Sequence, residues 1–330
     1  MPPSFIPFGA RTLLVGDIQL THSTPVARNP KPGKAWYVDP QGGSDTSSPN
    51  TGRSWAAAKA SMDGVFDEST FDDGDTIYLT GVLREYASTP THPTTTTRYV
   101  HDVSIIGVGN VPRQALTGTT HNGAGATWMS PTTVVNASAL LKIRGQGWHI
   151  ENIYFNNAGT GAPAIDIYRD AETVEADASH TRVVGCKFIG TDDGILATGG
   201  PNFVQIRNNE FFNFTGSGDT AINYLTGAGV GTHLMWQITG NVFVNNVNHI
   251  VVPCRSSFIS GNHFGHVGLD VTTTKHVDLT NGTRNTVMGN FFEVAHAETG
   301  SAAMFLPQST ANSWYNFYRD GDVALVPATA

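Results

Sequence analysis

Short runs in which apolar and polar residues alternate fill most of the chain after about residue 140, and glycine or asparagine separates them. Alternation with a period of two is typical of β-strands that bury one face. Six of these runs lead through a similar turn to an aromatic residue: HIENIYF, VVGCKF, QIRNNEF, QITGNVF, FISGNHF and TVMGNFF. They recur at intervals of roughly 20 to 35 residues, which indicates a solenoid whose turns stack on their neighbours.

A second apolar run follows most of these segments, as in AIDIY, GILAT and AINYL. A WD-type propeller needs blades of about 40 residues with four strands each, which the shorter and uneven intervals exclude. A β-sandwich would supply short strands without the recurrent asparagine–aromatic turn. We therefore expect an all-β fold, a right-handed parallel β-helix, whose coils occupy residues 111–300.

Equivalent positions of such a solenoid lie above one another, because each turn stacks on the previous one at about 4.8 Å. Asparagines at one bend can then form hydrogen bonds along the stack, and interior aromatic rings can form a column. The expected ladder consists of Asn152, Asn209, Asn241, Asn262 and Asn290, with Cys186 in one turn. The expected aromatic column consists of Tyr154, Phe188, Phe211, Phe243, Phe264 and Phe292.

The segments on either side of the coils have different compositions. Residues 1–35 are rich in proline, which fixes φ and removes an amide donor, so they predict an extended arm. Residues 36–110 predict the entry to the β-helix, with a capping helix from Trp55 to Phe66 and Ser54 as its N-cap. Residues 301–330 are rich in aromatic side chains and predict a C-terminal cap or a subunit contact.

The charge balance restricts the partners of the chain. Only 14% of the 330 residues are charged and the formal net charge is −8, which argues against binding to nucleic acid or to an anionic membrane. We see neither an apolar run long enough to cross a bilayer nor a secretory signal. The two cysteines predict no disulfide framework, so we expect a protein made in a bacterial cytoplasm.

Adjacent carboxylates at Asp192 and Asp193 raise the question of catalysis. A glycosidase needs two carboxyl groups about 5–10 Å apart with different pKa values, and Asp219 and Asp270 occupy comparable places on other turns, as does Asp166. The sequence Asp-Asp-Gly also makes an ordinary turn, in which Asp accepts backbone amides and Gly adopts a positive φ. We favour the turn and predict no catalytic residues. If the chain is an enzyme, the candidates are Asp192, Asp193, Asp219 and Asp270.

Metal and cofactor motifs are not apparent in the sequence. His263 and His266 are three residues apart, but this spacing works on a helix and splays across a β-bend. An acidic run of the kind that binds calcium is also missing. We predict no metal site and no cofactor.

The entry segment resembles that of right-handed β-helix proteins from tailed bacteriophages. The residues that carry the resemblance are Trp36–Pro40, Gly43–Asp45 and Gly74–Leu79, together with the helix candidate between them. The N-terminal sequence FGARTLLVGDIQL is similar to phage virion proteins encoded near the major capsid protein. The resemblance covers roughly the first 110 residues in motif, and pectate-lyase-like enzymes share the entry motif.

The resemblance implies a virion structural protein rather than an enzyme: a homotrimer that decorates the capsid exterior and binds the major capsid protein or other virion proteins. Two alternatives stay open. One is a tailspike or tail-fibre protein that binds or depolymerises a host surface glycan, and the other is a free pectate-lyase-like enzyme. The expected contact residues are Phe5, Ile6, Phe8, Leu13 and Leu14 in the arm, and Trp314, Tyr315, Phe317 and Tyr318 near the C-terminus.

Overall fold

The computed structural model describes residues 33–46, 50–95, 98–109, 125–131, 138–157, 161–170, 176–225, 233–265, 275–280, 282–293, 305–306 and 313–318. The predicted contact residues of the arm and Asp270 lie outside these ranges. Among the described residues, no helix is long and apolar enough to cross a membrane.

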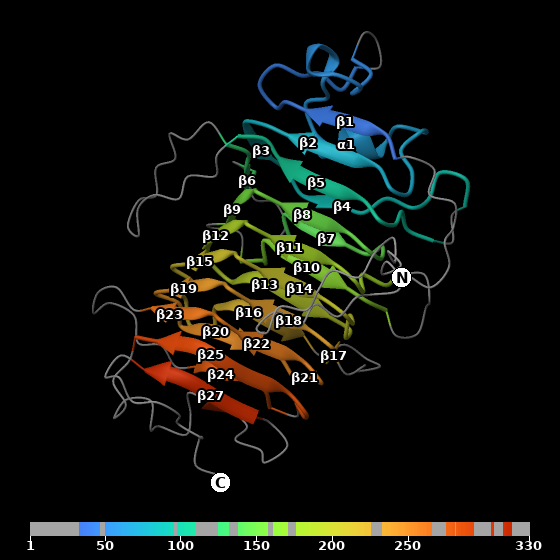
Figure 1. Cartoon of the computed structure of the whole chain (residues 1–330). Helices are drawn as coiled ribbons and strands as arrows, with labels where there is room; N and C mark the ends of the chain where they lie inside the picture. The colour runs from blue at the N-terminus through green and yellow to red at the C-terminus, as the bar shows by residue number, and fades with distance from the viewer. Residues whose placement is uncertain are drawn as a thin grey trace, which may run out of the picture. The chain divides into compact units, whose positions relative to one another are not determined.

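Parallel strands stack in three columns, which confirms the predicted right-handed parallel β-helix (Figure 1). The first column contains β1 (Ala35–Val38), β2 (Thr76–Leu79), β5 (Ser104–Gly107), β8 (His149–Glu151), β11 (Arg182–Val184), β14 (Gln205–Arg207), β18 (Gln237–Thr239), β22 (Phe258–Ser260), β25 (Thr286–Phe292) and β27 (Ser313–Tyr318). The second contains β3 (Val82–Arg84), β6 (Thr127–Met129), β9 (Tyr154–Asn157), β12 (Lys187–Gly190), β15 (Glu210–Phe212), β19 (Val242–Val244) and β23 (His263–Gly265), which also pairs with β25.

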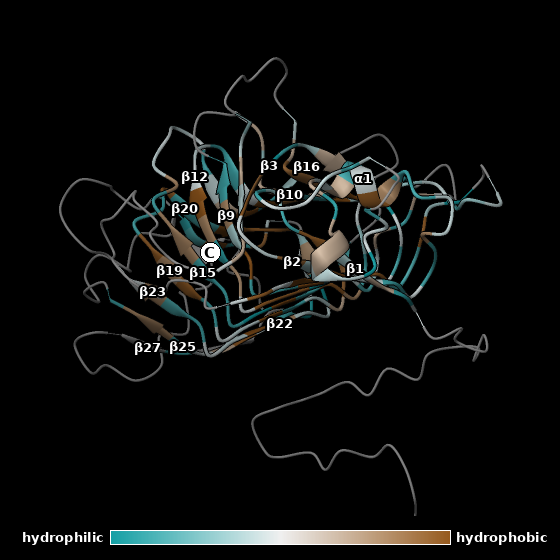
Figure 2. Cartoon of the chain, turned by 90° about the horizontal axis from the view of Figure 1, so that it is seen from above, coloured by the Kyte–Doolittle hydropathy of each residue, from teal (hydrophilic) through white to brown (hydrophobic). Residues whose placement is uncertain are grey.

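The third column contains β4 (Ala87–Ser88), β7 (Leu141–Ile143), β10 (Ile165–Tyr168), β13 (Asp193–Thr198), β16 (Thr220–Leu225), β20 (Asn248–Val251), β24 (Lys275–Asp278) and β26 (Phe305–Leu306). A short pair, β17 (His233–Leu234) and β21 (Cys254–Arg255), joins two of the turns. Apolar residues of the stacked strands appear brown in Figure 2, which looks along the stack.

Alternation along each strand places one residue in the core and the next outside. In the first column the inward residues pair turn after turn and are fully buried: Ile150, Val183, Ile206, Ile238, Ile259 and Val287. Because all of these strands pair in parallel, each apolar side chain packs on a similar one above and below it. The core is therefore a set of columns that continue from turn to turn.

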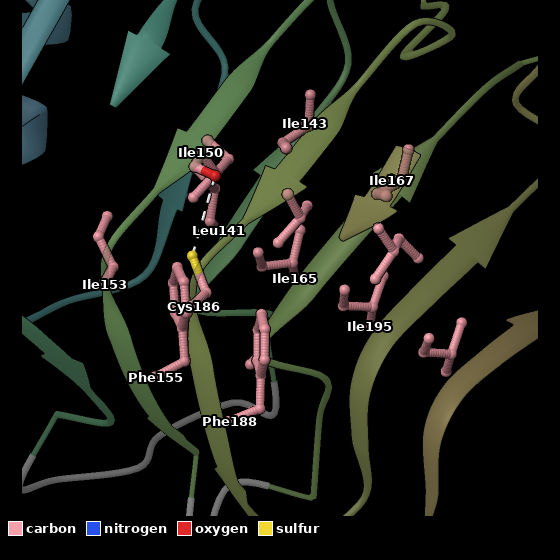
Figure 3. Close-up of a cluster of buried hydrophobic side chains, with 14 of the residues drawn as sticks. Leu141, Ile143, Ile150, Ile153, Phe155, Ile165, Ile167, Cys186, Phe188 and Ile195 are labelled. Carbon is pink, nitrogen blue, oxygen red and sulfur yellow. Dashed lines mark hydrogen bonds between the residues drawn. The ribbon is translucent and has the colours of Figure 1, made fainter. Parts of the chain in front are cut away.

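The buried aromatic column begins one turn earlier than the sequence predicted. Rings stack in the order Trp128, Phe155, Phe188, Phe211, Phe243, Phe264 and Phe292, with centroids 4.6–5.8 Å apart. The prediction that Tyr154 belongs to the column was wrong, since Tyr154 pairs with Lys187 and its neighbour Phe155 pairs with Phe188 (Figure 3). In HIENIYF both Tyr and Phe can follow the turn, and the register selects Phe.

Asparagine side chains link successive turns at the bend between the first and second columns. The backbone amides of Cys186, Asn209, Asn241, Asn262 and Asn290 each donate to the side-chain oxygen of the next asparagine, at 2.8–3.2 Å. The series ends at Asn316, which the sequence analysis did not include. Each amide group inside the series also donates to a buried backbone carbonyl, so the ladder satisfies polar groups that have no access to water.

Asn152 was wrongly placed in the ladder. Its φ is 57°, and Gly185, Asn208, Gly240, Gly261 and Gly289 have similar positive φ values just before the ladder position. Asn152 therefore adopts the left-handed conformation of the turn, which asparagine tolerates better than most residues. Its side chain donates to the carbonyl oxygens of Gly107 and Gly109, and Ile153 follows at the ladder position (Figure 3).

The predicted capping helix from Trp55 to Phe66 is interrupted. A 3-10 turn (Trp55–Ala57) and a short helix α1 (Met62–Phe66) replace it, and Ser61 rather than Ser54 caps α1 by accepting from the Gly64 amide. Between them Lys59 pairs with the free edge of β1 through backbone bonds to Tyr37 and Asp39. Satisfying this edge outweighs local helix propensity.

Candidate functional site

The side chain of Asp193 is hydrogen-bonded to residues of the following turn of the β-helix. Its side chain is only 6% exposed, and its carboxylate accepts the Thr220 backbone amide at 3.1 Å and the Asn223 side-chain amide at 3.0 and 3.2 Å. Asp192 precedes it with a φ of 77°. The following residue must be glycine, because a Cβ on Gly194 would lie 2.6 Å from the Ala221 carbonyl oxygen. Asp192–Gly194 thus forms a turn that is tied to the next turn.

Three of the predicted carboxylates interact electrostatically. The pKa of Asp193 is raised to about 7, mainly by burial and also by the charges of Asp192 and Asp219, while the hydrogen bonds from Asn223 and Thr220 oppose the shift. Burial and Asp219 also raise the pKa of Asp192. The carboxylate of Asp219 accepts the Gly216 amide at 2.7 Å in its own turn. A carboxyl group with a pKa near 7 could transfer a proton, but the hydrogen bonds of Asp193 all support the fold.

Asp166 belongs to a different group on the outer face of the third column. Its carboxylate accepts the Thr198 hydroxyl at 2.8 Å and lies 3.6 Å from the Lys142 ammonium. Burial raises the pKa of Asp166, although Thr198 and Lys142 oppose the shift. The register places Asp166 between Lys142 and Leu196, one turn away from Asp193.

Contacts of Lys142 and Arg144 link this carboxylate to two tyrosines. The Lys142 ammonium lies 4.6 Å from the centre of the Tyr168 ring, and the Arg144 guanidinium lies 5.6 Å from it. Arg144 also donates to the Tyr99 hydroxyl at 3.0 Å. We call Tyr99, Lys142, Arg144, Asp166 and Tyr168 the cation–tyrosine cluster. The sequence analysis missed it, because its members come from separate turns.

Apolar side chains are exposed on the outer face at the C-terminal end of the described coils. Met288 and Phe291 of β25 are 41% and 37% exposed. On the neighbouring strand β22, Phe258 is opposite Thr286, two residues before Met288. The His263 ring is 5.1 Å from that of Phe291, and its Nε2 lies 2.9 Å from the Glu293 carboxylate. We call Phe258, Met288 and Phe291 the apolar patch.

Of the two histidines considered above, the structure describes one. His263 is engaged with Glu293, and His266 lies outside the described residues. The described residues contain a different group with metal-ligand chemistry, Asp72, Asp73 and His92. The two cysteines, Cys186 and Cys254, are separate buried thiols, and burial raises the pKa of each to about 12. Neither offers a thiolate at neutral pH.

Of the predicted contact residues near the C-terminus, Trp314, Tyr315, Phe317 and Tyr318 lie in β27, which pairs with β25. Their backbone therefore belongs to the last described turn of the first and second columns. The register places Tyr315 opposite Met288 and Phe317 opposite Phe291. The apolar patch and the C-terminal aromatic residues thus follow one another along the stack.

No family model and no curated protein matches the chain. Among solved structures, it is similar to a pectate lyase from Bacillus sp. N165 in complex with trigalacturonate, with 13% identity, a TM-score of 0.50 and coverage of 77% of this chain and 76% of that one. The likeness shows the fold.

Two viral proteins also match, at lower scores. The Dettilon tailspike protein is 15% identical with a TM-score of 0.39, and the match covers 79% of this chain and 55% of the tailspike. The ORF18 protein of Geobacillus virus E2 is 13% identical with a TM-score of 0.38, and the match covers 74% of this chain and 53% of that one.

Proposed function

We propose that the chain is a structural protein of a bacteriophage particle, which decorates the capsid exterior as a homotrimer. The resemblance of the entry segment and of the N-terminal sequence to phage virion proteins supports this role. The parallel β-helix suits it, because stacked turns with a continuous ladder give a stiff body. Its partners are other copies of itself and the major capsid protein.

The apolar patch is the observation that carries the proposal. Met288 and Phe291 are among the more exposed large apolar side chains of the described residues, and they flank the bend of β25 at Gly289 and Asn290. On the next strand, β27, Tyr315 is opposite Met288 and Phe317 is opposite Phe291. Aromatic residues and methionine are enriched at the cores of protein interfaces. A second copy of the chain would cover this surface.

Asp192 and Asp193 favour a structural role over catalysis. The carboxylate of Asp193 accepts three hydrogen bonds from the following turn, so its oxygens are directed toward the β-helix itself. A general acid must reach the substrate oxygen that it protonates, at about 2.6–3.2 Å. These bonds and its 6% exposure direct Asp193 away from a substrate outside the β-helix.

Measurement of the native mass tests the oligomer. The wild-type chain should elute with the mass of a trimer in size-exclusion chromatography with light scattering, and the double variant Met288→Ser, Phe291→Ser should elute as a monomer. Val82→Ser is the matched control, since Val82 is a similarly exposed apolar residue (36%) far from the patch along the stack. A monomeric wild type, or a double variant that stays trimeric, would contradict the proposal.

The cation–tyrosine cluster favours a second function, the binding of a host surface glycan as in a tailspike. Tyrosine rings can stack on the apolar face of a sugar, and Lys142 and Arg144 can pair with an acidic substituent. This function predicts retention on an immobilised acidic polysaccharide that is lost in Tyr168→Ala and kept in Tyr78→Ala. A depolymerase would also release new reducing ends or unsaturated products, and loss of this activity in Asp193→Asn would favour an enzyme.

A further inference from the structure

Two loops meet at the N-terminal end of the coils and bring a histidine to two aspartates. Asp72 and Asp73 precede β2, and His92 lies in the loop after β4. One potential ligand atom from each residue lies within 4.8 Å of the others, and His92 Nε2 is 2.6 Å from Asp72 Oδ1. The His92 side chain is only 10% exposed, so the group is partly enclosed.

Each of the three residues has a second partner. The other ring nitrogen of His92, Nδ1, accepts the Thr94 backbone amide at 3.3 Å and lies 2.8 Å from the Thr94 hydroxyl. Binding of a metal through Nε2 therefore requires the ring proton to move to Nδ1, where it faces the Thr94 hydroxyl oxygen. Asp73 accepts the His101 amide at 2.8 Å and pairs with Arg98 at 2.8 Å, while Asp72 accepts the Asp73 amide. Metal-binding histidines almost always donate their second nitrogen to an oxygen, and ligating carboxylates are themselves hydrogen-bonded.

We propose that Asp72, Asp73 and His92 bind a divalent transition metal of the Zn²⁺ type, with water as the fourth ligand. One imidazole and two carboxylates suit zinc, whereas calcium and magnesium prefer oxygen ligands only. Zinc–ligand bonds of about 2.0–2.2 Å place tetrahedral ligand atoms about 3.4 Å apart. The 2.6 Å contact between His92 Nε2 and Asp72 Oδ1 would therefore open on binding, and pairs as wide as 4.8 Å would close.

Local charge also favours a cation. Asp75 approaches the same loop, where its buried carboxylate accepts the Asp72 amide at 3.1 Å and the Trp36 indole at 2.7 Å. Three carboxylates therefore share this corner, and Arg98 balances one of them. A bound ion would tie the loop after β4 to the loop before β2. It would therefore brace the first turns of the β-helix.

Binding should be measured on the full-length chain without a histidine tag, after dialysis against a chelator. We expect one Zn²⁺ per chain by calorimetry and by elemental analysis, together with a higher melting temperature. His92→Gln and Asp72→Asn should abolish binding. Thr94→Val, which leaves all three ligands in place, should weaken binding about 10- to 100-fold. His263→Gln removes the histidine of another His–carboxylate pair, and it should bind like the wild type.

Substitution with Co²⁺ adds a direct view of the ligands. The visible spectrum of the cobalt form should be that of a four-coordinate ion, and His92→Gln should remove it. Circular dichroism verifies that each variant is folded. The proposal is overturned if the wild type binds no zinc at micromolar concentration. It is also overturned if folded His92→Gln and Asp72→Asn bind zinc as the wild type does.

Discussion

Replacing Asn241 with alanine tests whether the asparagine ladder stabilises the β-helix. Asn241 is fully buried in the middle of the series. Its oxygen accepts the backbone amide of Asn209 at 2.9 Å, and its amide group donates to the Ile206 carbonyl at 2.9 Å and to Asn262 at 3.0 Å. Alanine would remove these bonds. The buried backbone N–H of Asn209 and the buried carbonyl of Ile206 would then lose the side-chain partner that Asn241 provides.

The magnitude follows from the number of groups left unpaired. An unsatisfied buried donor or acceptor costs about 1–3 kcal/mol, so two of them should lower the free energy of unfolding by about 2–6 kcal/mol. This is a large part of the roughly 5–15 kcal/mol by which a domain is stable. Urea denaturation followed by circular dichroism and tryptophan fluorescence measures the difference.

Thr239→Ala is the matched control for this measurement. Thr239 lies on β18 two residues before Asn241, but its side chain is on the outer face. Surface substitutions of this kind change stability by about 0.5 kcal/mol or less. If Asn241→Ala lost no more stability than Thr239→Ala, the ladder would not hold the turns together and the reasoning would be refuted.

Three further predictions concern the core, the buried carboxylate and the arm. Phe243→Ala, which removes a ring that stacks on Phe211 and Phe264, should lower the free energy of unfolding by about 3–5 kcal/mol in the same assay; a loss under 1 kcal/mol would contradict a packed column. The pKa of Asp193 rises on folding from 3.8 to about 7, so its contribution to stability decreases as pH rises from about 4 to 7. Asp193→Asn has no titrating group here, so its stability does not decrease in this way. The urea midpoint of the variant minus that of the wild type should therefore be larger at pH 8 than at pH 5; the same difference at both pH values would exclude the pKa shift. Deletion of residues 1–20 should leave the circular dichroism unchanged and abolish incorporation into particles, whereas normal occupancy would show that the arm is not the anchor.

The fold could be predicted because its signal is repeated. Alternation and the recurrent turn specify inward and outward residues in every coil, and one error in phase does not change the architecture. The phase of the first coil was wrong at Asn152 and Tyr154, because asparagine suits both the left-handed turn position and the ladder position that follows it.

Features that depend on contacts between turns were not visible in the sequence. The helix from Trp55 to Phe66 is broken because Lys59 pairs with β1, which no local propensity encodes. The cation–tyrosine cluster and the group of Asp72, Asp73 and His92 combine residues from separate turns or loops. Such neighbours follow from the register and from loop paths, and the spacing of residues along the chain does not specify either.

Imaging of purified virus particles by electron cryomicroscopy tests the proposed function most directly, because it shows location and copy number together. We predict a trimer of parallel β-helices on the outer surface of the capsid. Density for the chain at the tail tip alone, or its absence from purified particles, would contradict this function.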